Sequence, residues 1–351
     1  METKDIKSLT LAELKAEMAA LGEKPFRAAQ LYEWMHRKLS RGFEDMSNIP
    51  MAMKEKCGKN YSYTALRTVR VQESGLDGTK KYLFALADGN VVESVWMRYH
   101  YGNSVCISSQ VGCRMGCRFC ASGIGGLVRG LSPSEMLGQV YRLQRIMGER
   151  VSNVVVMGTG EPLDNYDSLL TFLRILTGEK GLHISQRNVT VSTCGIVPKM
   201  YELAKEHLQI TLALSLHGAT QEKRKQLMPV ANAYELEKVL TACDDYFRET
   251  GRRITFEYSL IRGVNDTEED VRELVRILGP RNCHLNLIPV NSVKEYDLKQ
   301  PDRKNAQNFK NKLEKYGINV TLRRELGADI DGACGQLRRS YVRTQIEEAE
   351  L

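Results

Sequence analysis

Three cysteines stand close together in the stretch CRMGCRFC, at Cys113, Cys117 and Cys120. A structural zinc site normally uses four protein ligands, often as two Cys-x-x-C pairs, but this chain has only one such pair. Three thiolates can instead hold three irons of an iron-sulfur cube and leave the fourth iron free for a substrate. We therefore predict a 4Fe-4S cluster with one open iron. A zinc knuckle completed by His100 or Cys106 is the alternative.

The bulk composition supports a chemical role for clustered thiols. The chain has 351 residues and nine cysteines, an odd number, and its charged start METKDIKSLT does not resemble a secretion signal. A disulfide framework is therefore not expected, and metal binding or catalysis explains the cluster better. No apolar run is long enough to span a membrane, so we expect a cytoplasmic protein. The scattered cysteines fit small core residues; they are Cys57, Cys194, Cys243 and Cys283.

The elements that must position these thiols begin with a small accessory region. Over residues 1–60 the pattern predicts a helical module. The apolar residues from Leu9 to Leu21 have helical spacing, and Thr10 with Glu13 forms a capping box. Residues 61–102 contain three β-rich stretches separated by Gly-containing turns, which predicts a short antiparallel meander. Glu93 lies in the last of its strands.

After residue 103, short apolar runs alternate with helical stretches, which is typical of repeated βα units around a parallel sheet. Six strands are predicted, at 104–109, 153–158, 188–193, 210–216, 253–260 and 284–289. The predicted fold is thus α/β, a partial (βα)6 barrel over residues 103–325. A seventh apolar run, INVTLR, follows near 318, and residues 326–351 form a C-terminal segment with Cys334. Because the cysteine loop follows the first strand, it should lie at the C-terminal mouth of the barrel.

A glycine-rich stretch, MGTGEP, follows the second of these strands. A dinucleotide-binding loop would need a third glycine, but Leu163 stands at that position, so NAD binding is disfavoured. The remaining glycines can let the backbone approach another ligand closely. A plain turn that starts a helix is the alternative.

The Cys-x-x-x-Cys-x-x-Cys pattern resembles the signature of radical S-adenosylmethionine (radical SAM) enzymes. Further stretches resemble the family of adenine methyltransferases that act on 23S rRNA, and the likeness spans nearly the whole chain. These stretches are CISSQVGC, MGTGEP, VSTCGIVP, LSLH, LMP, NLIPVN and DIDGACGQL. The sequence has SSQVG before the cluster, as enzymes that methylate C2 have, whereas C8 enzymes have SSQCG. The resemblance therefore favours C2, with C8 methylation of the antibiotic-resistance type as the alternative.

The resemblance implies one 4Fe-4S cluster on Cys113, Cys117 and Cys120, and two SAM molecules used per turnover. It also implies a SAM pocket lined by residues at or near the ends of predicted strands. These are Gly160, Glu161, Ser192, Ser215, Leu216, His217 and Asn291.

The resemblance gives Cys334 the role of methyl carrier. An adenine C2 carbon is not nucleophilic, whereas a thiolate readily attacks a sulfonium methyl group. In the family the S-methyl group of this cysteine is then activated by a radical and adds to the base. Cys106 releases the product by forming a transient disulfide with Cys334. Glu93 is the expected proton acceptor.

The implied substrates are adenine 2503 of 23S rRNA and adenine 37 of tRNAs. A net charge of +7 favours a polyanionic partner, and basic residues surround Cys334; they are Arg323, Arg324, Arg338, Arg339 and Arg343. An electron donor such as flavodoxin and a monomeric state are further expectations. Two other functions stay open at this point. One is a radical SAM activase that makes a glycyl radical on a protein, and the other is an RNA-binding module with structural zinc.

Overall fold

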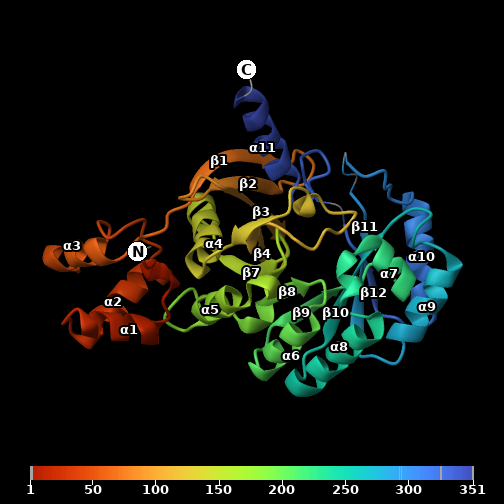
Figure 1. Cartoon of the computed structure of the whole chain (residues 1–351), viewed down its shortest axis with the longest axis horizontal. Coiled ribbons are helices and arrows are strands. Elements are labelled where there is room, and N and C mark those ends of the chain that lie inside the picture. Colours follow the sequence, from red (N-terminus) through yellow and green to blue (C-terminus); the bar gives the residue numbers. More distant parts are fainter. Residues whose placement is uncertain (1–2, 292, 294, 325, 350–351) are drawn as a thin grey trace.

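The N-terminal module is helical, as predicted. The computed structural model describes residues 3–291, 293, 295–324 and 326–349. The module contains the short 3-10 helix η1 (Ile6–Ser8), followed by α1 (Leu11–Ala20), α2 (Pro25–His36) and α3 (Met51–Asn60). The predicted capping box is present, since Thr10 and Glu13 satisfy each other's backbone N–H groups at the start of α1. Figure 1 shows the module projecting to one side of the molecule.

The predicted meander is present, but it does not stand apart from the barrel. Strands β1 (Arg67–Glu73), β2 (Lys80–Ala85) and β3 (Val91–Tyr99) pair antiparallel. β3 also pairs antiparallel with β4 (Gly102–Ile107), the first barrel strand. Meander and barrel thus form one ten-stranded sheet, and Glu93 lies on β3, directly beside the barrel strand β4 that carries Cys106. The proposed boundary at residue 102 falls inside this continuous sheet.

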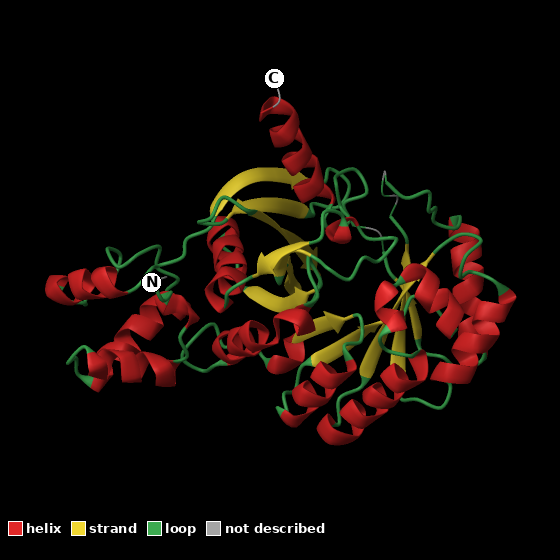
Figure 2. Ribbon diagram, in the orientation of Figure 1, coloured by secondary structure: helices red, strands yellow, loops and turns green. Residues whose placement is uncertain are grey.

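The barrel is an α/β structure in which all six predicted strands are confirmed. They correspond to β4, β7 (Val151–Val156), β8 (Val189–Thr193), β9 (Thr211–Ser215), β10 (Ile254–Leu260) and β11 (Cys283–Pro289). These strands pair in parallel, and the seventh apolar run adds β12 (Val320–Leu322) to the edge. Figure 2 shows the strands curving around an interior that helices cover from outside.

The covering helices follow the strands in alternation, as the sequence predicts. They are α4 (Pro133–Met147), α5 (Tyr166–Thr177), α6 (Val197–Lys205), α7 (Gln221–Leu227), α8 (Leu236–Thr250), α9 (Glu268–Leu278) and α10 (Arg303–Lys315). A small hairpin that the sequence did not predict, β5 (Gln110–Gly112) with β6 (Leu127–Gly130), closes the base of the cysteine loop. Among the described residues, no helix is both long and apolar enough to cross a membrane.

The N-terminal module shares one hydrophobic core with the barrel, which extends from Ile6 to Val320. A polar contact lies within this interface: Nδ1 of His36 on α2 is 2.8 Å from the hydroxyl of Tyr141 on α4. Both side chains are buried. Burial lowers the pKa of His36 to about 3, so the imidazole is neutral in the folded protein at neutral pH.

This buried histidine makes stability sensitive to acid. The unfolded chain binds a proton at the ordinary His pKa of about 6.5, whereas the folded chain does so only near pH 3, so stability falls as the pH drops below 6.5. Over the interval from pH 6.5 to 5 one such group contributes a loss of about 2 kcal/mol. Urea unfolding at pH 7.5 and 5.0 should therefore show a smaller loss for His36→Gln than for the unchanged protein. An equal loss in both would contradict this explanation.

Candidate active site

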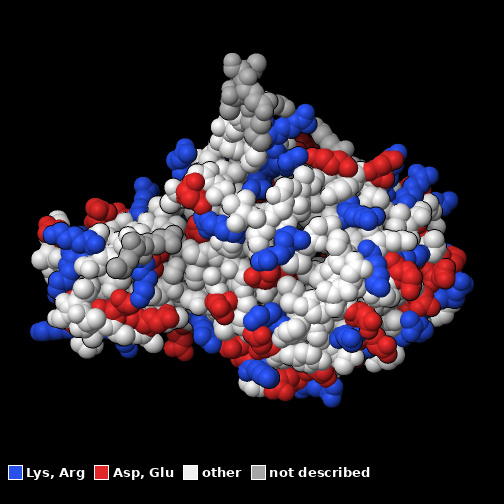
Figure 3. Space-filling view, in the orientation of Figure 1, with Lys and Arg blue, Asp and Glu red and all other residues white. Residues whose placement is uncertain are grey.

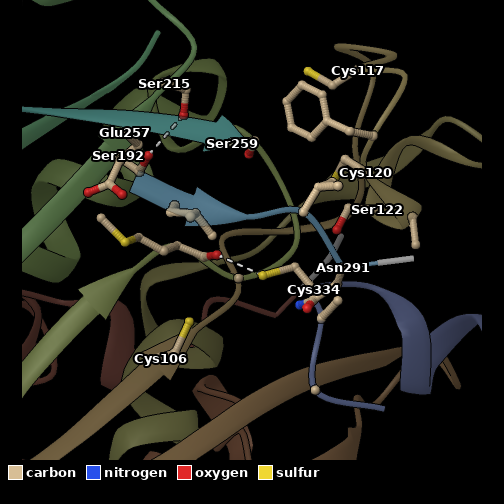
Figure 4. A pocket seen from close by; sticks show the side chains of 18 of the residues that line it. Cys106, Cys117, Cys120, Ser122, Ser192, Ser215, Glu257, Ser259, Asn291 and Cys334 are labelled. Carbon is tan, nitrogen blue, oxygen red and sulfur yellow. Dashed lines mark hydrogen bonds between the residues drawn. The ribbon is translucent and has the colours of Figure 1, made fainter. Parts of the chain in front are cut away.

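A pocket lies at the C-terminal ends of the parallel strands, where the position of the cysteine loop predicts it. Its volume is about 310 Å³, which is within the range of small-molecule sites. The cluster cysteines, both relay cysteines and most residues assigned to SAM line it together. They are Cys106, Cys113, Cys117, Cys120, Gly160, Glu161, Ser192, Ser215, His217, Asn291 and Cys334. Figure 4 shows several of them pointing toward one cavity.

The three clustered cysteines occupy the loop between β5 and the 3-10 helix η2 (Ala121–Gly123). All three are free thiols that face the pocket, and Cys117 and Cys120 are close enough to interact electrostatically. Burial is the main cause of the raised pKa values of Cys113 and Cys117. Among the described residues, no group of three His, Cys, Asp or Glu side chains is arranged to bind one metal ion. An iron-sulfur cube binds each thiolate through a different iron, so a set of thiols that share a pocket fits its donor chemistry.

Cys106 and Cys334 meet at Met157, the residue that follows β7. The Cys334 thiol donates to the Met157 carbonyl oxygen over 3.2 Å, and Cys106 has a backbone hydrogen bond with the same residue. Figure 4 shows Cys106 on β4 and Cys334 on the loop before α11 (Gln336–Ala349). Residues far apart in the sequence are thus brought together, as the predicted disulfide chemistry requires.

Burial raises the pKa of both thiols, to about 12 for Cys106. The Cys334 side chain is exposed, and it lines the pocket. Cys334 raises the pKa of Cys106 and Cys120 raises that of Cys334, whereas the cations Lys81 and Arg323 lower the pKa of both relay thiols. The free protein therefore holds these groups as thiols beside two positive charges that favour deprotonation.

The Cys334 loop is anchored to the meander by a buried ion pair. Lys81 Nζ lies 3.0 Å from Glu93 Oε2, and each side chain is at most 4% exposed. Lys81 also donates to the carbonyl oxygens of Asp331 and Ala333, at 2.6 Å each. Glu93 accepts from the backbone N–H of Gly335 at 2.8 Å and of Arg338 at 2.5 Å. Glu93 thus lies behind Cys334 with both carboxylate oxygens occupied, and it does not line the pocket.

Glu161 is a buried carboxylate at the pocket wall. It accepts from the backbone N–H of Leu163 at 3.1 Å and of Cys194 at 2.7 Å. Burial raises its pKa, while these hydrogen bonds oppose the rise. Gly160 before it has φ of +111°, and an added Cβ would lie 2.6 Å from Gln110. This glycine therefore satisfies both a backbone conformation and a close approach of β7 to the cysteine hairpin.

Gly158 is required for a similar reason, because an added Cβ would lie 2.7 Å from the Ile107 carbonyl oxygen. Gly158→Ala should push the end of β7 away from β4 and destabilise the protein by about 1–3 kcal/mol. Thermal unfolding measures this effect. Gly58→Ala is the matched control, because nothing lies within 4 Å of the added atom in that helix. Equal stability of the two variants would contradict the close packing.

His217 is a fixed hydrogen-bond donor at the pocket wall. Its Nδ1 accepts from the Ser259 backbone N–H over 2.9 Å, which leaves the proton of the neutral ring on Nε2. Burial lowers its pKa to about 3, and Arg224 adds to this effect. Nearby, the hydroxyls of Ser192 and Ser215 lie 3.3 Å apart at the ends of β8 and β9. These groups offer both donors and acceptors to a polar ligand.

Leu216 does not share this placement. Its side chain is fully buried in the core and does not line the pocket. Its N–H donates to the Glu257 carbonyl oxygen and its own carbonyl accepts from Gly218, so its backbone groups are already used. The structure thus brings together every residue assigned to SAM except this one.

Several residues line the pocket although the sequence did not predict them there. Glu257 is 5% exposed and accepts from the Asn286 amide at 2.9 Å, and burial raises its pKa. Arg323 and Arg324, which we expected at an RNA surface, line the pocket beside the relay thiols. A glutamate or serine in the middle of an apolar strand run, as in ITFEYSL, is the signal that could have indicated Glu257 and Ser259.

Comparison with known proteins agrees with this arrangement. Residues 107–276 match the radical SAM superfamily model, and residues 4–61 match the ribosomal RNA large subunit methyltransferase N-terminal domain. A probable dual-specificity RNA methyltransferase RlmN from Lachnospira eligens is 60% identical over 346 residues, covering 99% of both chains. The corresponding protein of Lachnoclostridium phytofermentans is also 60% identical, covering 99% of this chain and 98% of that one. A radical SAM methyltransferase from Sphaerobacter thermophilus is 40% identical in sequence. Its crystal structure superposes with a TM-score of 0.91, and the match covers 95% of this chain and 98% of that one.

Fold and site together define a radical SAM enzyme, which uses a 4Fe-4S cluster and S-adenosylmethionine. Within that superfamily the chain belongs to the RlmN family of RNA methyltransferases. The zinc-module and glycyl-radical activase alternatives are thereby set aside. The donor set fits the cluster, because three free thiols on one loop face the pocket that also holds the residues assigned to SAM.

Proposed function

We propose that this enzyme methylates C2 of adenine 2503 in 23S rRNA and of adenine 37 in tRNAs, with two SAM molecules used per turnover. Relatives that are 60% identical over nearly the full chain bear the name dual-specificity RNA methyltransferase, which supports two kinds of RNA substrate. The single observation that carries the mechanism is that the three cluster cysteines and the two relay cysteines line one pocket, which Cys194 also lines. Three come from one loop, one from β4 and one from the segment before α11.

Cys113, Cys117 and Cys120 hold the cluster in this proposal, and Glu161 accepts from the SAM ammonium group. When bound and reduced, the cluster supplies an electron that cleaves SAM to methionine and a 5′-deoxyadenosyl radical. Ser192, Ser215, His217 and Asn291 orient the cofactor by hydrogen bonds. Leu216 would contribute only indirectly, since its side chain lies in the core and does not line the pocket.

The thiolate of Cys334 first accepts the methyl group of one SAM molecule, and S-adenosylhomocysteine leaves. Lys81 and Arg323 favour the thiolate, since each lowers the pKa of Cys334. The methyl group of Cys334 then loses a hydrogen atom to the radical, and the resulting carbon radical adds to the adenine ring. The adduct becomes closed-shell by losing one electron, which the oxidised cluster would accept, and the ring proton. The thiolate of Cys106 attacks the Cys334 sulfur, which releases the methylated base and leaves a Cys106–Cys334 disulfide for a reductant to reopen.

Glu93 is proposed to accept the ring proton. Its carboxylate binds Lys81 and the N–H groups of Gly335 and Arg338 in the described conformation. The proton transfer therefore requires a hydrogen bond between Glu93 and the Cys334 segment to break, so that a carboxylate oxygen becomes free to accept the proton of the attached base.

The proposed partners are structured RNAs and an electron donor such as flavodoxin, and the enzyme is proposed to act as a cytoplasmic monomer. Figure 3 shows Lys and Arg side chains around the base of α11 and on the N-terminal module, with acidic side chains among them. Such a mixed basic surface contacts RNA through backbone and shape, while the target base enters the pocket.

Mass spectrometry of 23S rRNA and tRNA from cells with and without the gene tests the proposal. We expect 2-methyladenine at both positions only when the gene is present. An 8-methyladenine product would replace the C2 assignment by the C8 alternative. Unmodified RNA in both strains would overturn the proposed function.

A further inference from the structure

A buried arginine lies behind the cysteine loop with part of its charge unmatched. Arg224 on α7 is 0% exposed. Its Nη2 donates to the Cys194 carbonyl oxygen over 2.6 Å, but Nε and Nη1 have no partner among the described residues. The described part of the chain also provides no carboxylate within ion-pair distance of it. A buried guanidinium that lacks an anion is strongly unfavourable, so something else must balance it.

The surroundings of Arg224 indicate what balances it. The groups that interact with its charge are the thiols of Cys194, Cys117 and Cys243 and the imidazole of His217, which is neutral because burial lowers its pKa to about 3. Burial raises the pKa of Cys194 and Cys243, which keeps both neutral. Cys117 becomes an anion when it ligates iron. The only one of these neighbours with a proposed anionic state is therefore a cluster ligand.

The chain is shaped to bring this arginine to the cysteine loop. The Arg118 backbone N–H donates to the Leu227 carbonyl oxygen at the end of α7, over 2.9 Å. Leu227 and Met228 pack in one apolar cluster with Cys117. Arg224 does not line the pocket, so it faces the cluster site from the protein side rather than from the SAM side.

Two glycines leave the room that this arginine occupies. A Cβ added at Gly195 would lie 3.3 Å from Arg224 Nη2, and one added at Gly218 would lie 2.6 Å from the Arg224 backbone nitrogen. Gly195 has φ of +96°, so it also holds a conformation that favours glycine. The guanidinium thus sits in a fitted cavity beside the loop.

We propose that Arg224 is the counter-charge of the iron-sulfur cluster and makes the cluster easier to reduce. The inference depends on the proposal that Cys113, Cys117 and Cys120 hold the cluster. A cluster with three thiolate ligands is anionic, and reduction adds one more negative charge. A fixed positive charge in a low-dielectric surrounding stabilises the reduced form more than the oxidised form.

Redox titration of the reconstituted full-length enzyme, followed by electron paramagnetic resonance, tests this role. At a fixed solution potential near the midpoint of the unchanged enzyme, Arg224→Met should lower the ratio of reduced to oxidised cluster at least tenfold, equivalent to 59 mV. Arg224→Lys keeps the charge and should stay within about threefold of the unchanged enzyme. The shift should be present without SAM as well as with it. Unchanged titration of a fully loaded Arg224→Met enzyme would overturn the proposal.

Cluster content and the stability of the cluster-free chain give independent readouts. Loss of iron and sulfide from Arg224→Met but not from Arg224→Lys supports the charge role, whereas equal loss from both contradicts it. Without the cluster, Arg224→Met should unfold at the same or a higher temperature than the unchanged chain, because it removes an unmatched charge. A lower temperature would show that the hydrogen bond of Arg224 to the Cys194 carbonyl outweighs its unmatched charge, which contradicts the proposal. Full cluster content in Cys117→Ala would refute the assignment of Cys117 as a cluster ligand. That result would be a failure of the proposed function and not of the role of Arg224 alone.

Discussion

Replacing Cys334 by alanine is expected to abolish RNA methylation while cluster assembly and reductive SAM cleavage continue. The thiol faces the pocket and contacts Met157, but it does not belong to the cysteine loop. Because the side chain carries the methyl group covalently, its removal should cost at least about 10³-fold in turnover. Methyl transfer to RNA and release of 5′-deoxyadenosine, measured in the same reaction, separate the two effects.

Cys283→Ala is the matched control, because that buried cysteine begins β11 and does not line the pocket. It should keep full activity. Methylation at even a tenth of the normal rate in Cys334→Ala would exclude the relay, since no other route to C2 through this pocket is proposed. Loss of iron from Cys334→Ala would instead give that thiol a role in holding the cluster.

Cys106→Ala should give a different product from the same pocket. Without the second thiol nothing attacks the Cys334 sulfur, so the base stays attached to the protein through the methylene bridge. Mass spectrometry of digested protein should find a nucleotide on the peptide with Cys334. Free methylated RNA at the normal rate would contradict the role of Cys106.

The sequence predicts those parts of the site in which residue spacing itself has chemical meaning. Cys113, Cys117 and Cys120 lie within one short stretch of the chain, so one loop is enough to bring them together. The resemblance assigns Ser192 and Ser215 to the SAM pocket, and their placement agrees with it because parallel strands all end at the same edge of the barrel. These placements depend on local pattern and on a fold that the strand periodicity already specifies.

The unpredicted parts depend on contacts between distant segments. Lys81, in the stretch KKYLFAL, has the spacing of an ordinary strand lysine, yet it is 1% exposed because carbonyl groups about 250 residues later surround it. Arg224 stands between Lys223 and Lys225 in QEKRKQL, and no local pattern shows that it alone of the three is fully buried. Such partners are set by tertiary packing, and a single sequence does not record them.

Lys81→Met is expected to destabilise the protein by about 3–5 kcal/mol and to loosen the segment that carries Cys334. The variant leaves Glu93 buried without its counter-charge and removes the donor from two loop carbonyls. Urea unfolding measures the stability. Hydrogen exchange of residues 327–338 measures the loop directly, since the N–H groups of Gly335 and Arg338 bind the same carboxylate.

Lys80→Met is the matched control one residue earlier on β2. Lys80 pairs with Glu73 at 3.0 Å, but that glutamate is 58% exposed, so the change should cost less than about 1 kcal/mol and leave loop exchange unaltered. Combining Lys81→Met with Glu93→Gln should cost less than the sum of the two single changes, because the double variant no longer buries an unpaired charge. If Lys81→Met and Lys80→Met behave alike, the buried pair does not hold the loop. Cys334 would then owe its position to the remaining contacts with β1 and the turn after it, through Gln72 and Ser74.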